Sequence, residues 1–429
     1  MSDALKRIGK LDDVEVRPVI ASPQKSGYRN KAEFLIRNGE IGYTNAADRR
    51  FVAVESCLLV SDAINRTISA VRERLKGFGG RLSGVVIRSN EKGEVMVTFT
   101  SDTGCDKTAR TERMKTLPGL VSLNFCRLKP RPVHALDGAV TRLFGADTMM
   151  STMCGRRFFL SPQSFFQVNT SAAERLYMEA VDGLELTGNE TVVDAYCGAG
   201  TIGLTAADRC KTVFGVEIVP EAIENARRNA KENGITNAEF VADDAARLLP
   251  AQRKRGLKPD AVIVDPPRKG LDVKLIDALL LVRPQKIAYV SCDPGTLARD
   301  LHLFCAGGYR IGSVQPVDLF PQTGHVETVV LLSKGEIDSR KIRVEFPLDD
   351  MEITAFREKA TYPQIKEYVL EQAGLKVSSL YISQIKRKCG LDVGDSYNKP
   401  KSESAKVSQC PPEKEAAIMD ALRHFGMIS

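Results

Sequence analysis

Residues 192–203 read Val-Val-Asp-Ala-Tyr-Cys-Gly-Ala-Gly-Thr-Ile-Gly, and this stretch decides the fold. It joins an apolar strand to a helix through a glycine-rich turn. Gly198 and Gly200 let the backbone turn tightly and approach a ligand beside the amide groups of the helix N-terminus. A Gly-x-Gly-x-x-Gly pattern alone is weak, because it also fits the pyrophosphate of a dinucleotide. The stretch therefore predicts a ligand-binding turn and leaves the ligand open.

Apolar strands alternate with helices on either side of this turn, from about residue 171 to residue 332. Apolar strands joined by helices pair in parallel and are covered on both faces. We therefore predict an α/β fold with a doubly wound, mostly parallel sheet. The expected strands are 192–195, 213–217, 261–265, 287–291 and 328–332, with helices at 202–208 and 220–233.

Acidic residues follow three successive strands of this sheet. Asp194 precedes the glycines, where a carboxylate would repel a phosphate but suits an ammonium group. Glu217 ends the next strand, in position to accept both hydroxyls of a ribose, and Asp244 suits the amino group of adenine. Each acid alone could instead cap a helix, but capping does not explain the series. An adenosine that carries an amino acid and no phosphate is S-adenosylmethionine, which we predict as the cofactor.

Two loops at the tips of later strands carry candidate chemistry, Asp265-Pro-Pro-Arg-Lys-Gly and Ser291-Cys-Asp-Pro-Gly-Thr. Asp-Pro-Pro loops occur in enzymes that methylate planar nitrogens, but there an aromatic residue follows, whereas Arg268 stands here. Cys292 ends a strand ahead of a helix, whose N-terminus is expected to favour the thiolate. We interpret Cys292 as a nucleophile; the alternative is a small buried hydrophobic residue.

Glu327 opens the last apolar strand of the series. Burying a carboxylate in such a strand costs free energy, which indicates that the residue has a function. Glu327 is therefore a candidate base. His325 lies on the same expected face, and it keeps no assigned role because it could equally be a satisfied core residue.

The regions that flank the sheet differ from it in composition. Residues 1–170 read as mostly β with one helix at 61–76, and they carry 27 Lys and Arg against 17 Asp and Glu. This surplus favours docking of a nucleic acid, although a lysine-rich solubility surface would look the same. Helical patterns follow residue 335, where Lys-Arg-Lys ends one helix and either an RNA-binding module or a solvated appendage fits. We predict a basic, β-rich RNA-binding domain at 1–165, a cofactor-binding domain at 166–334 and a helical extension at 335–429.

The chain has 429 residues, of which 43% are hydrophobic and 27% charged, which excludes a disordered or collagen-like chain. No apolar run approaches the roughly 20 residues that span a bilayer. The ten cysteines form no Cys-x-x-Cys pair. We therefore expect a cytoplasmic monomer without a membrane partner.

The chain resembles the RNA uracil-5-methyltransferase family, whose bacterial members modify 23S ribosomal RNA or transfer RNA. The resemblance runs from about residue 28 to residue 332, and five motifs stand in the family's order. They are Ser164-Phe-Phe-Gln-Val-Asn, Asp194-Ala-Tyr-Cys-Gly-Ala-Gly, Asp265-Pro-Pro-Arg-Lys-Gly, Ser291-Cys-Asp-Pro-Gly-Thr-Leu-Ala-Arg-Asp and Phe320-Pro-Gln-Thr-Gly-His-Val-Glu-Thr-Val.

The resemblance implies a class I (Rossmann-like) methyltransferase fold and a covalent mechanism. Cys292 would add to carbon 6 of uracil, carbon 5 would accept the methyl group, and Glu327 would remove the carbon 5 proton. Related 5-methylcytosine enzymes carry a cysteine just after the two prolines, so Arg268 favours uracil. The favoured substrate is 23S ribosomal RNA, with transfer RNA as the alternative. The residues implied to bind the cofactor are Gln167, Tyr196, Glu217 and Asp265, and those implied near the RNA are Arg29 and Lys31, to which we add Arg268.

The chain departs from the family at its start. Many relatives begin with a small β-barrel and a cysteine cluster that, with a fourth cysteine, binds a 4Fe–4S centre. Cys57 matches the fourth ligand, but the printed sequence holds no other member of the set. One thiolate cannot hold a cluster, so we expect no iron–sulfur cluster and no metal in this chain. Either this lineage works without the cluster or the sequence is a shortened one.

Overall fold

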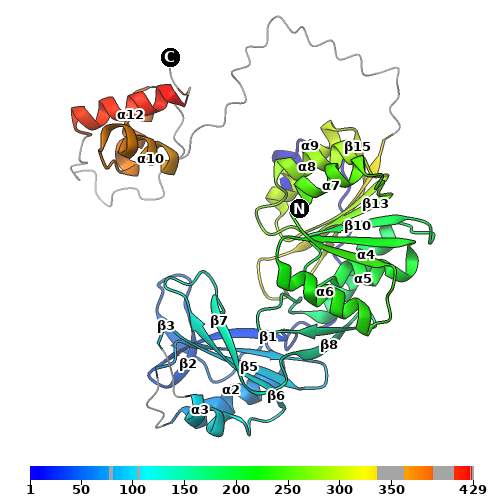
Figure 1. Cartoon of the computed structure of the whole chain (residues 1–429), viewed down its shortest axis with the longest axis vertical. Helices are drawn as coiled ribbons and strands as arrows, with labels where there is room; N and C mark the ends of the chain where they lie inside the picture. The colour runs from blue at the N-terminus through cyan, green and yellow to red at the C-terminus, as the bar shows by residue number, and fades with distance from the viewer. Residues whose placement is uncertain (77–80, 104–106, 336–361, 390–409, 426, 428–429) are drawn as a thin grey trace, which may run out of the picture. The chain divides into compact units, whose positions relative to one another are not determined.

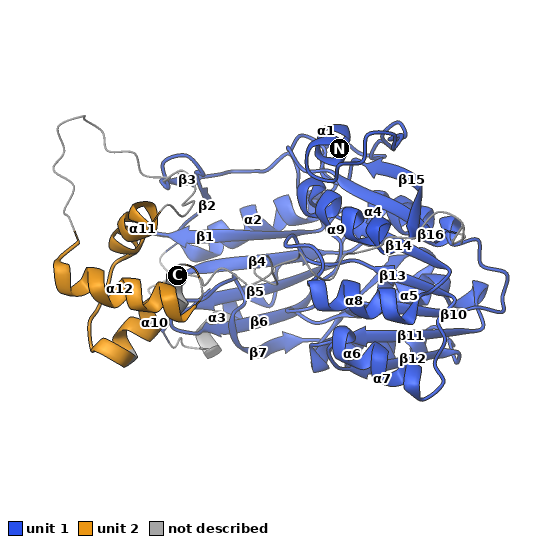
Figure 2. Ribbon diagram, turned by 90° about the horizontal axis from the view of Figure 1, so that it is seen from above, with its two compact units in different colours: residues 1–337 blue, residues 338–429 orange. Residues whose placement is uncertain are grey.

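The computed structural model describes residues 1–76, 81–103, 107–335, 362–389, 410–425 and 427. The chain divides into two compact units, residues 1–337 and 338–429, which Figure 2 colours separately. None of the described helices is long and apolar enough to cross a membrane.

The predicted doubly wound sheet is confirmed in the first unit. Its order is β12-β11-β10-β13-β14-β16-β15, and the five strands from β12 to β14 are parallel. The strands are β10 (Thr191–Ala195), β11 (Thr212–Glu217), β12 (Ala238–Ala242), β13 (Ala261–Val264), β14 (Lys286–Ser291), β15 (Tyr309–Val317) and β16 (Glu327–Lys334).

The last two strands differ from the expected parallel series. β16 lies antiparallel between β14 and β15, and the sequence pattern did not reveal β15 at all. The segment from 318 to 326 between β15 and β16 holds no helix, and so short a connection can join only antiparallel neighbours. Gly312 and Pro316 interrupt the apolar pattern of β15 and hide it from a reading by periodicity.

Helices cover both faces of this sheet because alternate strand residues point to opposite sides. Val192 packs in one core with α4, α5 and α6, and its neighbour Val193 packs in another with α7, α8 and α9 (Figure 1). The helices are α4 (Thr170–Gly183), α5 (Thr201–Ala206), α6 (Pro220–Glu232), α7 (Ala245–Lys254), α8 (Val273–Val282) and α9 (Pro294–Ala306).

The expected β-rich part forms a second sheet in the order β3-β2-β1-β4-β5-β6-β7. Helix α2 (Asp62–Leu75) packs Ile64, Ile68 and Val71 onto it, and α3 (Lys107–Met114), which the sequence did not indicate, lies beside α2. The strands are β1 (Lys31–Arg37), β2 (Glu40–Thr44), β3 (Phe51–Ala53), β4 (Gly84–Ser89), β5 (Val95–Ser101), β6 (Leu120–Leu128) and β7 (Gly138–Gly145), and a hairpin of β8 (Met149–Met153) and β9 (Arg156–Leu160) follows.

The first twenty residues pack with the parallel sheet although they precede the β-rich part in the chain. Helix α1 (Ser2–Arg7) lies against α9 and buries Leu5, which is 1% exposed. Val16 and Ile20 form isolated parallel bridges to Val314 and Val317 of β15. The edge strand of the sheet is therefore partly covered by the N-terminal segment.

The second unit contains α10 (Tyr362–Ala373), α11 (Ser379–Lys388) and α12 (Pro412–His424) around a small apolar core. The Lys-Arg-Lys run ends α11, where cations complement the helix dipole. Lys386 is 6% exposed and Lys388 forms an ion pair with Glu415, so two of the three cations have structural contacts. Residues 390–409, between α11 and α12, lie outside the described residues.

We predict that Leu5→Ala lowers the free energy of unfolding by about 2–4 kcal/mol, because truncating a buried leucine loses burial and leaves a cavity. Urea unfolding of the full chain measures the change. Ile8→Ala is the matched control, because Ile8 follows the same helix but is 51% exposed, and it should cost less than about 1 kcal/mol. Equal effects of the two changes would contradict burial of α1 against α9.

Candidate active site

Three reactive side chains meet at the carboxyl end of the parallel strands. Asp265 follows the last residue of β13, Cys292 follows β14, and Glu327 opens β16. Ser291 of β14 pairs with Thr328 of β16. Cys292 comes directly after Ser291 and Glu327 directly before Thr328, so the register of the two strands brings them next to each other. All three line a cavity of about 630 Å³ together with Gln167, Arg268 and Arg29.

A second cavity of about 550 Å³ lies over the glycine-rich turn. The two cavities share Phe165, Asp265 and Pro267, so they adjoin at the Asp-Pro-Pro loop. The structure therefore brings most of the residues predicted from sequence into two neighbouring cavities, whereas Lys31 and Gly200 line neither of them. The predicted residues that line the second cavity are Asp194, Tyr196, Gly198, Glu217, Asp244 and Asp265.

Asp194 supplies an unpartnered acceptor to the second cavity. Its side chain is fully buried, and Oδ2 accepts a hydrogen bond of 2.8 Å from the amide of Gly203. Oδ1 has no partner among the described residues. Burial raises the pKa of Asp194 to about 7. A buried acceptor without a donor is unfavourable, so the site fits a ligand that brings an N–H or ammonium group.

The other two acids have protein partners as well as the cavity. Glu217 accepts hydrogen bonds from the amides of Gly198, at 3.3 Å, and Val219, at 3.0 Å. Asp244 caps α7 by accepting from the amide of Ala246 at 2.8 Å. Asp244 therefore caps a helix, as the alternative interpretation expected, and it also lines the cavity.

The turn uses its two glycines differently. Gly198 has a φ of 54° and open space where a Cβ would stand, as expected beside a ligand. Gly200 has a φ of 82° and lines neither of these cavities, and a Cβ there would lie 3.2 Å from the Phe240 ring. Gly200 is thus required for the turn and for packing. Tyr196 takes a φ of 70°, which is unusual for a residue with a side chain, and lines the cavity.

Burial dominates the electrostatics of the reactive cavity. It raises the pKa of Glu327 to about 7, although Arg268 partly opposes the shift. Burial and the neighbouring Glu327 raise the pKa of Asp265 to about 8. The pKa of Cys292 is also raised, first by burial and then by Glu327 and Asp265. The net shift in the pKa of Cys292 is therefore opposite to the one expected from the helix N-terminus alone. The carboxylate of Asp293 already caps α9, where it accepts from the amide of Thr296 at 2.8 Å.

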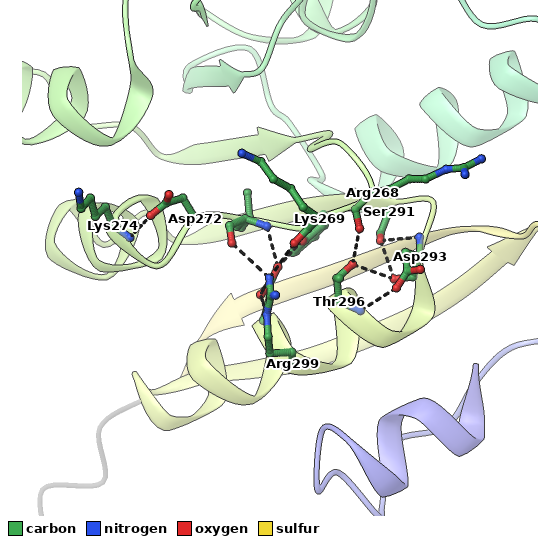
Figure 3. Close-up of polar contacts among 11 residues, drawn as sticks. Arg268, Lys269, Asp272, Lys274, Ser291, Asp293, Thr296 and Arg299 are labelled. Carbon is green, nitrogen blue, oxygen red and sulfur yellow. Dashed lines mark hydrogen bonds and ion pairs between the residues drawn. The ribbon is translucent and has the colours of Figure 1, made fainter. Parts of the chain in front are cut away.

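A buried network holds the Asp-Pro-Pro loop against α9 (Figure 3). Asp300 is fully buried, and its Oδ2 accepts hydrogen bonds from the amide of Leu271 at 2.8 Å and the hydroxyl of Tyr289 at 2.6 Å. Arg299 donates to the other oxygen at 2.8 Å and to the carbonyl of Lys269 at 3.0 Å. The network links the loop that carries Asp265 to the helix that follows Cys292.

Several site residues had no role in the sequence analysis. Asp300 and Arg299 lie in a quoted motif, but only the fold places them under the loop. Tyr177 is buried on α4 and lines the second cavity, and its periodic position favours a core residue. Phe165 is 72% exposed and lines both cavities, and an exposed aromatic residue inside a motif is the signal that could have found it.

Comparisons with known proteins show which family this chain resembles. A family model described as tRNA (Uracil-5-)-methyltransferase matches residues 146–335. An uncharacterized RNA methyltransferase of Streptococcus mutans is 39% identical over 354 residues, which cover 78% of each chain. A similar protein of Lactiplantibacillus plantarum is 40% identical over 346 residues, or 76% of each chain. The solved tRNA (uracil-54, C5)-methyltransferase of Pyrococcus abyssi, in complex with S-adenosyl-L-homocysteine, superposes with a TM-score of 0.64 at 30% identity and covers 77% of this chain and 81% of its own.

We predict that Asp300→Asn lowers the free energy of unfolding by about 1–3 kcal/mol, because a charged acceptor of three hydrogen bonds is replaced by a neutral one. Urea unfolding measures the loss, and hydrogen exchange at the Leu271 amide should become faster. Asp277→Asn on the exposed side of α8 is the control and should change neither quantity. Unchanged exchange at Leu271 in the Asp300 variant would show that the network does not hold the loop.

Proposed function

Because this chain belongs to the RNA uracil-5-methyltransferase family, we propose that it methylates carbon 5 of a uridine in RNA through a covalent adduct with Cys292. The observation that carries the proposal is the shared cavity of Cys292 and Glu327, which adjoins the Asp194 cavity at Asp265. A nucleophile, a base and a bound methyl donor would then meet around one pyrimidine ring. The target uridine must leave any base stack to reach the cavity.

Cys292 supplies the activation that carbon 5 lacks. The thiol first gives its proton to solvent, the sulfur then bonds to carbon 6, and the electrons of the carbon 5–carbon 6 double bond form an enolate; the sulfur regains a proton after it leaves carbon 6. Arg268 lines the same cavity, and its charge lowers the pKa of Cys292 against the effect of burial. The guanidinium therefore favours the anionic form of the nucleophile. The bound cofactor supplies an electrophilic methyl group to carbon 5.

Glu327 completes the cycle as the base. Once carbon 5 carries the methyl group, the carboxylate removes the remaining proton there, the double bond reforms and Cys292 leaves carbon 6. Burial raises the pKa of Glu327 to about 7, which makes its carboxylate a stronger base than an exposed one. The same shift leaves part of the enzyme in the inactive, protonated form near neutral pH.

The second cavity suits S-adenosylmethionine by the chemistry of its lining. Asp194 offers the unpartnered oxygen, and Glu217 and Asp244 line the same cavity with acceptors. Gln167 lies in the reactive cavity, and Tyr177 lines the cofactor cavity; burial raises the pKa of Tyr177, and a hydrogen bond with Gln167 partly opposes the shift. We therefore place Gln167 between the two ligands, with Tyr196 and Gly198 beside the cofactor.

The class of RNA has two candidates. We propose 23S ribosomal RNA as the first substrate to test, on the resemblance of the motifs. The family model and the Pyrococcus abyssi enzyme both carry transfer RNA in their names, which favours transfer RNA as the second candidate. Mapping of 5-methyluridine in both RNA classes from a strain that lacks the gene distinguishes them.

We predict that RNA substituted with 5-fluorouridine, incubated with the protein and S-adenosylmethionine, forms an adduct that survives denaturing electrophoresis. Fluorine at carbon 5 cannot leave as a proton does, so the adduct is trapped. Cys292→Ala should abolish the adduct, whereas Cys305→Ala, in the helix that follows Cys292, should form it at the normal rate. An adduct that persists in Cys292→Ala would overturn the mechanism.

We predict that Glu327→Gln forms the first bond normally but releases methylated RNA roughly a hundredfold more slowly, because no base removes the carbon 5 proton. Quench-flow with natural uridine RNA should show an accumulated protein–RNA adduct. For the wild type, release should accelerate as the pH rises through about 7, because the carboxylate must be ionised. Rapid release by Glu327→Gln, with the same pH profile, would exclude Glu327 as the base.

A further inference from the structure

A third cavity, of about 440 Å³, adjoins the reactive one on the side of the β-rich sheet. Three cations line it, Arg29, Lys31 and Arg88, and Glu33 is the one acidic residue of its described lining. It shares Arg29, Phe165 and Val168 with the reactive cavity. An extended ligand with one group beside Cys292 can therefore continue directly into the third cavity.

Arg88 is the unusual member of this lining. It stands on β4, only 2% exposed, and donates one hydrogen bond of 2.6 Å from Nη2 to the carbonyl of Ser164. Its Nε and Nη1 are buried and have no partner among the described residues. Burial lowers its pKa to about 10, which still leaves the guanidinium charged at neutral pH. A buried cation with two unused donor nitrogens is unfavourable unless an anion joins it.

The protein supplies a partial counter-charge, because the charge of Glu33 raises the pKa of Arg88 against the larger effect of burial. Glu33 lines the cavity, but its carboxylate pairs with Lys31 at 3.0 Å and its side chain is 49% exposed. No ion pair joins Glu33 to Arg88 in the described part of the chain. The cavity thus retains a net positive charge after its one internal pair is counted. Tyr43 and Phe165 add aromatic surface to the same lining, which suits a nucleotide better than an isolated inorganic ion.

We infer that this cavity binds a phosphodiester group of the RNA strand next to the target uridine, with Arg88 as its buried ligand and Arg29 and Lys31 at its mouth. The inference rests on the proposed function, because it takes the occupant of the reactive cavity to be a uridine of an RNA chain. Guanidinium N–H groups form charge-assisted hydrogen bonds with phosphate oxygens, and two donor nitrogens of Arg88 lack a protein partner among the described residues. The phosphate contact orients the strand and carries no base specificity.

The test replaces one phosphate charge at a time. An RNA oligonucleotide carries 5-fluorouridine at the mapped position and a neutral methylphosphonate at a single neighbouring linkage. For the wild-type chain, a methylphosphonate at one particular linkage beside the uridine should weaken RNA binding about tenfold. The same substitution at the other linkages should weaken binding much less. For Arg88→Gln, the same methylphosphonate should lower the RNA affinity by less than about twofold, because the variant already lacks the side chain that binds this phosphate.

Two further variants keep the test decisive if Arg88→Gln does not fold. Lys31→Ala should likewise lose most of the sensitivity to that one linkage, since Lys31 is only 22% exposed at the mouth of the cavity. Arg50→Ala is the control, because Arg50 belongs to the same basic part, is 83% exposed and lies outside this cavity. Its sensitivity to each linkage should remain that of the wild type.

The outcomes separate the inference from the proposed function. Variants that remain as sensitive as the wild type at every linkage would overturn the phosphate site, even when the wild-type adduct with Cys292 forms. Failure of the wild type to form that adduct with any RNA would instead overturn the proposed function and the inference with it. Loss of sensitivity at one linkage in Lys31→Ala, when the wild type forms the adduct, supports the site.

Discussion

The antiparallel insertion of β16 between β14 and β15 is the constraint on which the site depends. A parallel strand in that place would present its carboxyl end at the edge where Cys292 lies, and Glu327 would stand at the opposite edge. The ladder from Lys286–Ser333 to Ser291–Thr328 instead starts β16 beside the end of β14. Backbone hydrogen bonds therefore set the separation of Cys292 and Glu327, and no flexible loop has to bring them together.

Burial of ionisable groups shifts their pKa values around the two cavities. Asp194, Asp265 and Glu327 all have pKa values raised mainly by burial, and Arg88 has one lowered for the same reason. Such groups lower stability unless a ligand or a partner compensates them. In Asp300 the compensation is internal, through Leu271, Tyr289 and Arg299. In Asp194 and Arg88 it is incomplete, and both residues line cavities.

The sequence predicted the elements whose patterns are simple. Four of the five parallel strands are short, apolar and separated by helices, so their periodicity identified them, and the doubly wound sheet is confirmed. The fifth, β12, was expected only as the strand that precedes Asp244. β15 and α1 were missed for different reasons. β15 contains glycine and proline, and α1 has only six residues, too few for a helical period to emerge. The packing of α1 on α9 joins residues almost 300 positions apart, and no local pattern reports such a contact.

The sequence by itself determined the fold class, the family and the position of each reactive residue at a strand tip, because these depend on local patterns and motif order. Only the tertiary structure decided how the residues act on one another. It placed Cys292 and Glu327 in one cavity that adjoins the cavity of Asp194, surrounded Cys292 with groups that raise its pKa, and assigned Gly200 to packing. It also showed the buried, unpartnered nitrogens of Arg88. These properties depend on burial and on distances between residues far apart in the chain, and the order of residues does not contain them directly.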